Sequence, residues 1–117
     1  MIVAVTKETK AYERRVALTP EVVQQLKKAG FSVRIEKDAG ISAHYSDEQY
    51  QQSGAEIVSD RDALLGQADI LLRVNAPTVE EIGRMKQGAV LISFLYAATH
   101  PDIVQACVKQ GISAFSV

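Results

Sequence analysis

The chain has 117 residues, of which 47% are hydrophobic and 23% are charged. This composition is close to the globular average and excludes a disordered chain, and no apolar stretch approaches the roughly 20 residues of a membrane-spanning helix. The net charge of −1 argues against general nucleic-acid binding, and the single cysteine, Cys107, excludes an internal disulfide and favours the cytoplasm.

Six short β-like runs alternate with helix signals along the chain. They cover residues 2–6, 32–36, 56–58, 70–74, 90–94 and 113–117. Strands that alternate with helices predict an α/β fold with a doubly wound, mainly parallel sheet of the flavodoxin or Rossmann-like type. Most of the runs are nearly continuous in apolar residues, as expected of strands covered on both faces. The run 32–36 instead alternates apolar and polar residues, which predicts a more exposed strand.

Helix start signals fall between these runs. Thr19 is an expected N-cap, with Pro20 as the first helical residue. The next three helices also have candidate N-caps with a side-chain oxygen, at Ser46, Ser59 and Thr78. Pro101 opens the last helix. The sequence then stops in the last predicted strand, so we expect a single domain, residues 1–117, cut from the N-terminal part of a longer chain.

The connection between the first strand and the first helix, residues 6–18, is the most informative segment. Such connections usually need about two to six residues, and longer ones tend to carry function. They leave the carboxyl end of a strand, where open α/β sheets bind ligands. Its charged residues include Lys7, Glu8, Glu13 and Arg15. Either Lys or Arg side chains here grip a carboxylate or phosphate, or Glu8 or Glu13 neutralises Arg15 and pins the loop to the sheet.

Two more loops are expected at the same edge, because parallel strands place their carboxyl ends together. They cover residues 73–77 and 95–99. The three loops predict a cleft whose candidate lining residues are Lys7, Glu8, Arg15, Asn75 and Tyr96. Asn75 could offer its amide to a ligand or to the first loop, and both Asn75 and Tyr96 could instead be packing and turn residues.

Several familiar catalytic and cofactor motifs are missing from the sequence. No G-x-G-x-x-G follows a strand, and there is no P-loop, no His/Cys spacing for a metal and no G-x-S-x-G. Cys107 lies on the apolar face of the last predicted helix and is interpreted as a small core residue. His44 is expected in a loop and His100 at a helix start, which leaves little support for proton transfer by either.

The opening segment carries a long, gapped motif. It consists of Lys7-Glu8, Glu13, Arg15-Val16-Ala17 and Thr19-Pro20, followed by Ala39-Gly40, Gly54-Ala55, Ala68-Asp69 and Lys86-Gln87-Gly88. Over its whole length the chain resembles the N-terminal domain shared by alanine dehydrogenases and nicotinamide nucleotide transhydrogenases. The resemblance implies Lys at position 75 and His at position 96 in alanine dehydrogenases. Asn75 and Tyr96 depart from that pattern and resemble instead the α subunit of proton-translocating NAD(P) transhydrogenase.

This resemblance implies a parent enzyme that transfers hydride between NAD(H) and NADP(H), coupled to proton movement through membrane domains. It implies that this segment flanks the NAD(H) cleft on the cytoplasmic side of the inner membrane, within a dimeric NAD(H)-binding component. No catalytic, cofactor-binding or metal residue is expected in residues 1–117, no cofactor is expected to bind them alone, and Arg15 is interpreted as structural or cleft-lining.

Two alternatives remain open. The chain could be the N-terminal domain of an alanine dehydrogenase, which acts on a different class of substrate. It could also be a free-standing α/β module that binds a ligand or protein partner through its basic first loop.

Overall fold

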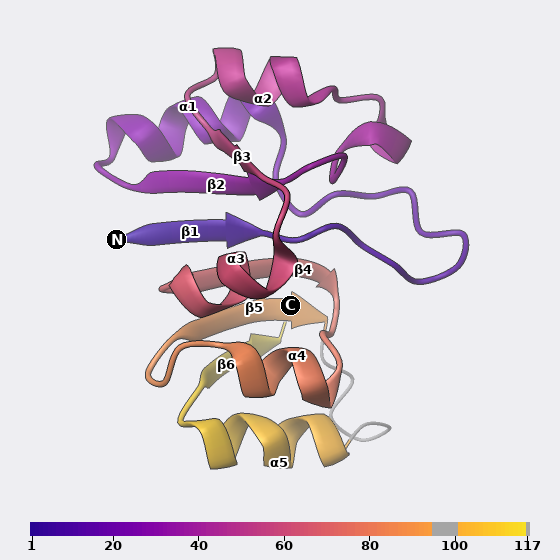
Figure 1. Cartoon of the computed structure of the whole chain (residues 1–117), viewed down its shortest axis with the longest axis vertical. Helices are drawn as coiled ribbons and strands as arrows, with labels where there is room; N and C mark the ends of the chain where they lie inside the picture. Colours follow the sequence, from indigo (N-terminus) through magenta and orange to yellow (C-terminus); the bar gives the residue numbers. More distant parts are fainter. Residues whose placement is uncertain (95–100, 117) are drawn as a thin grey trace.

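The protein is built on a six-stranded sheet in which every strand pair is parallel (Figure 1). The computed structural model describes residues 1–94 and 101–116. In sheet order the strands are β3 (Glu56–Val58), β2 (Ser32–Glu36), β1 (Ile2–Val5), β4 (Ile70–Asn75), β5 (Val90–Phe94) and β6 (Ser113–Ser116). The predicted parallel sheet is therefore confirmed, with strand bounds that agree to within one residue over the described part of the chain.

Helices cover the sheet from both sides. On one face lie α1 (Pro20–Lys28) and α2 (Asp47–Gln52), and on the other lie α3 (Arg61–Gln67), α4 (Val79–Arg84) and α5 (Pro101–Gln110) (Figure 1). A short 3-10 helix, η1 (Ile41–Ala43), precedes α2 and was not predicted. The connections change face between β1 and β4, so the point where ligands bind in such sheets lies between these two strands.

Side-chain caps explain where the helices begin. Thr19, Ser46 and Thr78 cap α1, α2 and α4, as predicted, and Ser46 forms a complete capping box as Thr78 does. The prediction that Ser59 caps the third helix was wrong. Asp60 fills that position and accepts the amide three residues later at 3.2 Å, because its carboxylate reaches the first-turn N–H groups and suits the helix dipole.

Strand β2 is an interior strand and is more exposed than β1, as predicted, because Ser32 is exposed and Arg34 and Glu36 are half-buried. It lies between β3 and β1, and its apolar residues point into the core under α1 and α2. Its polar residues find partners: Arg34 bonds Gln67 of α3 and pairs with Glu56, and Glu36 pairs with Arg61. The alternation in β2 therefore reflects ion pairs on one face of the strand.

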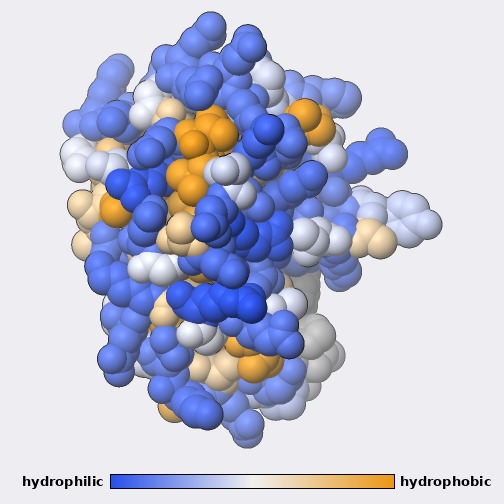
Figure 2. All heavy atoms as spheres, in the orientation of Figure 1, coloured by the Kyte–Doolittle hydropathy of each residue, from blue (hydrophilic) through white to orange (hydrophobic). Residues whose placement is uncertain are grey.

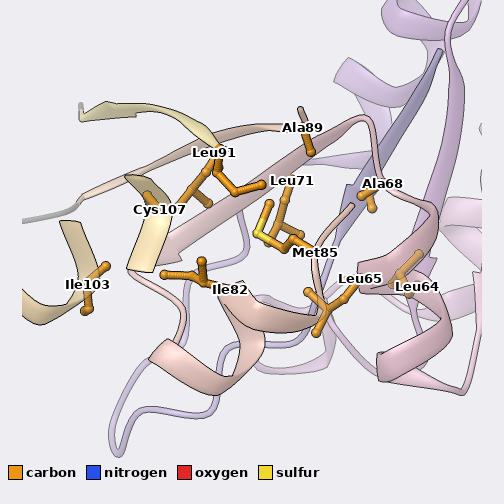
Figure 3. Packing of buried hydrophobic residues seen from close by; sticks show 12 residues of the cluster. Leu64, Leu65, Ala68, Leu71, Ile82, Met85, Ala89, Leu91, Ile103 and Cys107 are labelled. Atoms are coloured by element: carbon orange, nitrogen blue, oxygen red, sulfur yellow. The ribbon is translucent and has the colours of Figure 1, made fainter. Parts of the chain in front are cut away.

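Two apolar cores lie on opposite faces of the sheet. The core on the side of α3, α4 and α5 is formed by residues such as Leu65, Leu71, Ile82 and Leu91 (Figure 3). Cys107 packs there as well, and burial raises the pKa of its thiol, so the prediction of a small core residue is confirmed.

The second core lies under α1 and α2. Its largest member is Tyr50, which is fully buried and donates its hydroxyl to the carbonyl of Leu18 at 2.7 Å. Among the described residues, no helix is long and apolar enough to cross a membrane.

Candidate functional site

The loop of residues 6–18 projects from the carboxyl edge of the sheet, to the right in Figures 1 and 2. The face seen in Figure 2 is mostly hydrophilic, with apolar side chains in small separate patches. A turn closed by the Glu13 amide on the Lys10 carbonyl at 3.1 Å forms part of the loop. Tyr12 is fully exposed there, with a left-handed φ of 66°, whereas Leu18 is buried at the base.

Arg73 is the centre of the polar structure beneath this loop. It interrupts the apolar strand β4 and is only 6% exposed. Its Nε donates to Glu8 at 3.2 Å, and its Nη1 donates to Thr6 at 3.1 Å and to Glu81 at 3.2 Å. A buried guanidinium requires such partners, because an unpaired buried charge is costly. Arg73 thus joins the end of β1, the loop and α4.

Glu8 collects four donors from β4. Besides Arg73, its carboxylate accepts the amides of Val74 at 2.9 Å and Asn75 at 3.0 Å, and the Asn75 side-chain amide at 3.5 Å. Of the two alternatives for the loop, the described contacts correspond to the internal ion-pair network. Glu13 pairs with Arg15, one of the two expected pairings, whereas Glu8 pairs with Arg73, a partner that was not expected.

A second arginine extends the network toward β2. Arg61 of α3 pairs with Glu36 at 3.1 Å and with Glu81 at 3.6 Å, and it donates to the Lys7 carbonyl at 3.2 Å. The Lys7 amide donates to Glu36 at 2.7 Å. Lys7 is exposed and enters these bonds only through its backbone, so its side chain does not line the buried network.

Glu81 is held ionised by its surroundings. Burial acts to raise the pKa of its carboxyl, but the Thr78 amide and the positive charges of Arg73 and Arg61 outweigh burial and lower the pKa. The same carboxylate completes the capping box of α4, so the helix start and the ion network share one side chain.

Asn75 links this network to the outer part of the loop. Its side-chain Nδ2 donates to Glu13 at 2.8 Å. Glu13 in turn binds Arg15 through two parallel bonds, each 2.9 Å, to Nε and Nη2. The amide of Asn75 therefore serves the first loop, one of the two roles considered for it. The fork-to-fork contact fixes the plane of the Arg15 guanidinium at the protein surface.

The pH dependence of stability should report the Glu13 contacts. Its hydrogen bonds from Arg15 are the main cause that lowers the pKa of Glu13 from 4.5 to about 2, with burial opposing and Asn75 adding to the effect. Because the folded pKa is depressed, the stabilisation is complete above pH 4.5 and is lost as the pH falls from 4.5 toward 2. The free energy of unfolding of wild type should exceed that of Glu13→Gln at pH 7, and the gap should close over this window.

Urea unfolding of both proteins at a series of pH values measures this gap. Glu48→Gln, the same chemical change at an exposed carboxylate, is the control for the loss of one negative charge. If the difference in free energy of unfolding between wild type and Glu13→Gln stays constant down to pH 2, the Arg15 contact does not favour the ionised form of the Glu13 carboxyl.

Two hollows open beside these residues. The first, about 260 Å³, is lined by Thr9, Lys10, Arg73, Asn75, Ala76, Thr78, Glu81 and Ile103. The second, about 310 Å³, is lined by Arg15, Val16, Ala17, Leu72, Arg73, Val74 and Ile92. Most of the wall is apolar in both hollows, and charged groups of Arg73 and Glu81 reach the first while those of Arg15 and Arg73 reach the second. No cluster of potential metal ligands occurs in residues 1–94 and 101–116.

The structure brings together some of the predicted site residues. Glu8, Arg15 and Asn75 meet at the carboxyl edge through the contacts above, whereas Lys7 contributes only backbone groups. Tyr96 and the loop 95–99 lie outside the described residues, as does His100.

Sequence reasoning missed the importance of Arg73 with its partners Thr6 and Glu81, and of the neighbouring pair Arg61 and Glu36. A signal for Arg73 was present: a charged residue in an otherwise apolar strand must either reach solvent or find a buried partner.

The fold and the site define the class of protein. It is a Rossmann-like α/β domain with a polar crevice at its topological switch point. The profile of the family described as "Alanine dehydrogenase/PNT, N-terminal domain" matches residues 4–117, and the chain belongs to this family.

A transhydrogenase subunit and an alanine dehydrogenase both resemble this chain over all or nearly all of its length. The chain is 38% identical over 117 residues to NAD(P) transhydrogenase subunit alpha of Haemophilus influenzae, covering all of this chain and 22% of that protein. It is 39% identical over 116 residues to alanine dehydrogenase 1 of Staphylococcus aureus, covering 99% of this chain and 31% of the relative.

Solved structures give the same pair of similarities. The transhydrogenase from Sinorhizobium meliloti superimposes with a TM-score of 0.93 at 32% identity, covering 99% of this chain and 34% of the other. An L-alanine dehydrogenase superimposes with a TM-score of 0.93 at 31% identity, covering 99% of this chain and 32% of that protein. The chain thus spans at most about a third of the length of these relatives.

Proposed function

We propose that residues 1–117 form the N-terminal part of the NAD(H)-binding component of a proton-translocating NAD(P) transhydrogenase, in its α subunit. In this role the segment flanks the NAD(H) cleft and carries no catalytic residue of its own. The parent enzyme would transfer hydride between NAD(H) and NADP(H), with membrane domains as partners, a dimeric NAD(H)-binding component and a position on the cytoplasmic side of the inner membrane.

The environment of position 75 is the observation that carries this proposal. Asn75 is a neutral amide between two carboxylates, and its hydrogen atoms are directed to Glu13 at 2.8 Å and Glu8 at 3.5 Å. An oxoacid substrate needs positive charge at its carboxylate, and Asn75 supplies none. The nearby Arg15 is already held by the two oxygens of Glu13. The described part of this wall, formed by Glu8, Arg15 and Asn75, suits a cleft boundary better than an oxoacid site.

Alanine dehydrogenase activity is the second candidate, favoured by the 39% identity over almost the whole chain. The complete protein that carries this chain separates the two. Hydride transfer from NADPH to an NAD⁺ analogue of distinct absorbance, with no NADH-dependent amination of pyruvate, is the expected result. Efficient amination of pyruvate would overturn the transhydrogenase proposal.

The role of this segment within the enzyme has its own test. Calorimetric titration of the 117-residue chain with NADH should give no more heat than dilution, because the crevice between β1 and β4 holds the Glu8 side chain and the chain has no glycine-rich phosphate loop. Saturable binding would mean that the segment itself holds the cofactor, and a self-sufficient ligand-binding module would then be the better description.

A further inference from the structure

The crevice between β1 and β4 is the place where a doubly wound sheet is expected to bind a ligand. In this protein a side chain of the protein occupies it. Glu8 follows β1 by three residues, and its side chain, only 3% exposed, reaches across to the end of β4. The position of this carboxylate at the switch point is independent of which enzyme the chain belongs to.

The donors around Glu8 have the chemistry of a carboxylate-binding site. One oxygen accepts the Val74 amide at 2.9 Å and Arg73 Nε at 3.2 Å, and the other accepts the Asn75 amide at 3.0 Å. Two consecutive backbone amides and a guanidinium therefore bind both oxygens. Charge-assisted bonds of this kind are the strong ones in carboxylate recognition.

These donors all belong to β4 and keep their places without Glu8. Arg73 remains bonded to Glu81 and Thr6 through Nη1, and Asn75 remains paired with Phe94 of β5, whereas β1 pairs with β4 only as far as Leu72. Removal of the Glu8 carboxylate therefore leaves a preformed set of donors with space in front of them, while the rest of the network holds Arg73.

We propose that Glu8 is an internal ligand of a carboxylate-binding site built by Arg73, Val74 and Asn75 of β4. Glu8 acts as a positioning residue: it closes the site to free anions and ties the loop to β4, which sets the place of Asn75 against Glu13. A free carboxylate of matching size takes the site when the side chain is shortened.

Chemical rescue of Glu8→Ala tests this. Alanine keeps Cβ and removes a CH₂–COO⁻ fragment, which acetate matches in size and charge. The variant should unfold at a lower urea concentration than wild type at pH 7. Titration with sodium acetate against sodium chloride of equal ionic strength should restore the midpoint along a saturable curve. At ten times its Kd, acetate should raise the ratio of folded to unfolded protein about elevenfold.

Matched controls separate site binding from a general salt effect. Acetate should give wild type and the exposed-site variant Glu48→Ala no such saturable gain. Acetamide, which has the shape of acetate without its charge, should not rescue Glu8→Ala. Glu8→Gln fills the space with a neutral side chain and should not respond to acetate. The amide resonances of Val74 and Asn75 should move on substitution and return toward wild-type positions as acetate binds.

Each other outcome counts against the proposal. Equal stabilisation of wild type and Glu8→Ala by acetate, or equal rescue by acetamide, would show that no carboxylate site exists. If Glu8→Ala does not fold in chloride, recovery of its circular dichroism in acetate is the expected result, and failure to recover would overturn the proposal. A rescue that leaves the Val74 and Asn75 amides unmoved would place the acetate elsewhere and would overturn it too.

Discussion

Arg73→Met should lower the free energy of unfolding by about 3 to 5 kcal/mol, because it leaves buried carboxylates without their countercharge. Glu8 and Glu81 both lie 3.2 Å from the Arg73 guanidinium, and their side chains are 3% and 9% exposed. Methionine fills much of the same volume, so the loss comes mainly from charge. Arg61, 3.6 Å from Glu81, can compensate only that one carboxylate.

Urea unfolding at pH 7 measures this loss, with Arg84→Met as the matched control. Arg84 pairs with Asp62 at 3.5 Å, but both side chains are about half exposed or more, so that pair should contribute at most about 1 kcal/mol. The double variant Arg73→Met/Glu8→Gln should regain part of the lost stability, since it removes one of the stranded charges. Similar losses for Arg73→Met and Arg84→Met would refute the role of burial in this network.

The pattern of elements could be predicted because local signals and tertiary structure agree. Strands covered on both faces must be apolar throughout, and the capping boxes at Ser46 and Thr78 need only residues three positions apart. The 3-10 helix η1 was missed because it is only three residues long and has no side-chain cap. It ends at His44 in a left-handed conformation, with φ 67°, which histidine adopts more often than most non-glycine residues, but a single histidine does not mark a helix end.

The site could be predicted in outline but not in its pairings. The long first loop and the shared carboxyl edge located Glu8, Arg15 and Asn75 together. Which carboxylate meets which arginine depends on contacts such as Glu8 with Arg73, 65 residues apart in sequence. Spacing alone leaves such pairs undetermined, because the register of β1 against β4 and the path of the loop decide them.

Gly40→Ala should lower the free energy of unfolding by about 3 kcal/mol, through overpacking and the loss of a buried hydrogen bond. The φ of Gly40 is −98°, which any residue can adopt, so space is the constraint. A Cβ there would lie 2.6 Å from Cε2 and 2.7 Å from the hydroxyl oxygen of Tyr50. The Tyr50 ring is fully buried and cannot move without disturbing the second core.

The matched control is Gly83→Ala, the same chemical change where an added Cβ meets nothing within 4 Å. Because Gly83 lies in α4, alanine there should raise the free energy of unfolding by about 0.5 to 1 kcal/mol, opposite in sign to Gly40→Ala. The environment of Tyr50 gives a second readout. Burial raises its pKa to about 12, so displacement of the ring toward solvent should let the phenol ionise at lower pH in ultraviolet titration.

A Gly40→Ala protein as stable as wild type would show that the Tyr50 ring can yield without cost. The expected loss would explain why glycine stands after Ala39 in the segment that resembles the family motif. Tyr50 donates to the carbonyl of Leu18 at 2.7 Å, where the first loop ends and α1 is about to begin. The close approach of Gly40 thus holds the ring that fixes one end of the loop, while Glu8 fixes the other end to β4. Both anchors are needed to place Arg15 and Glu13 between them.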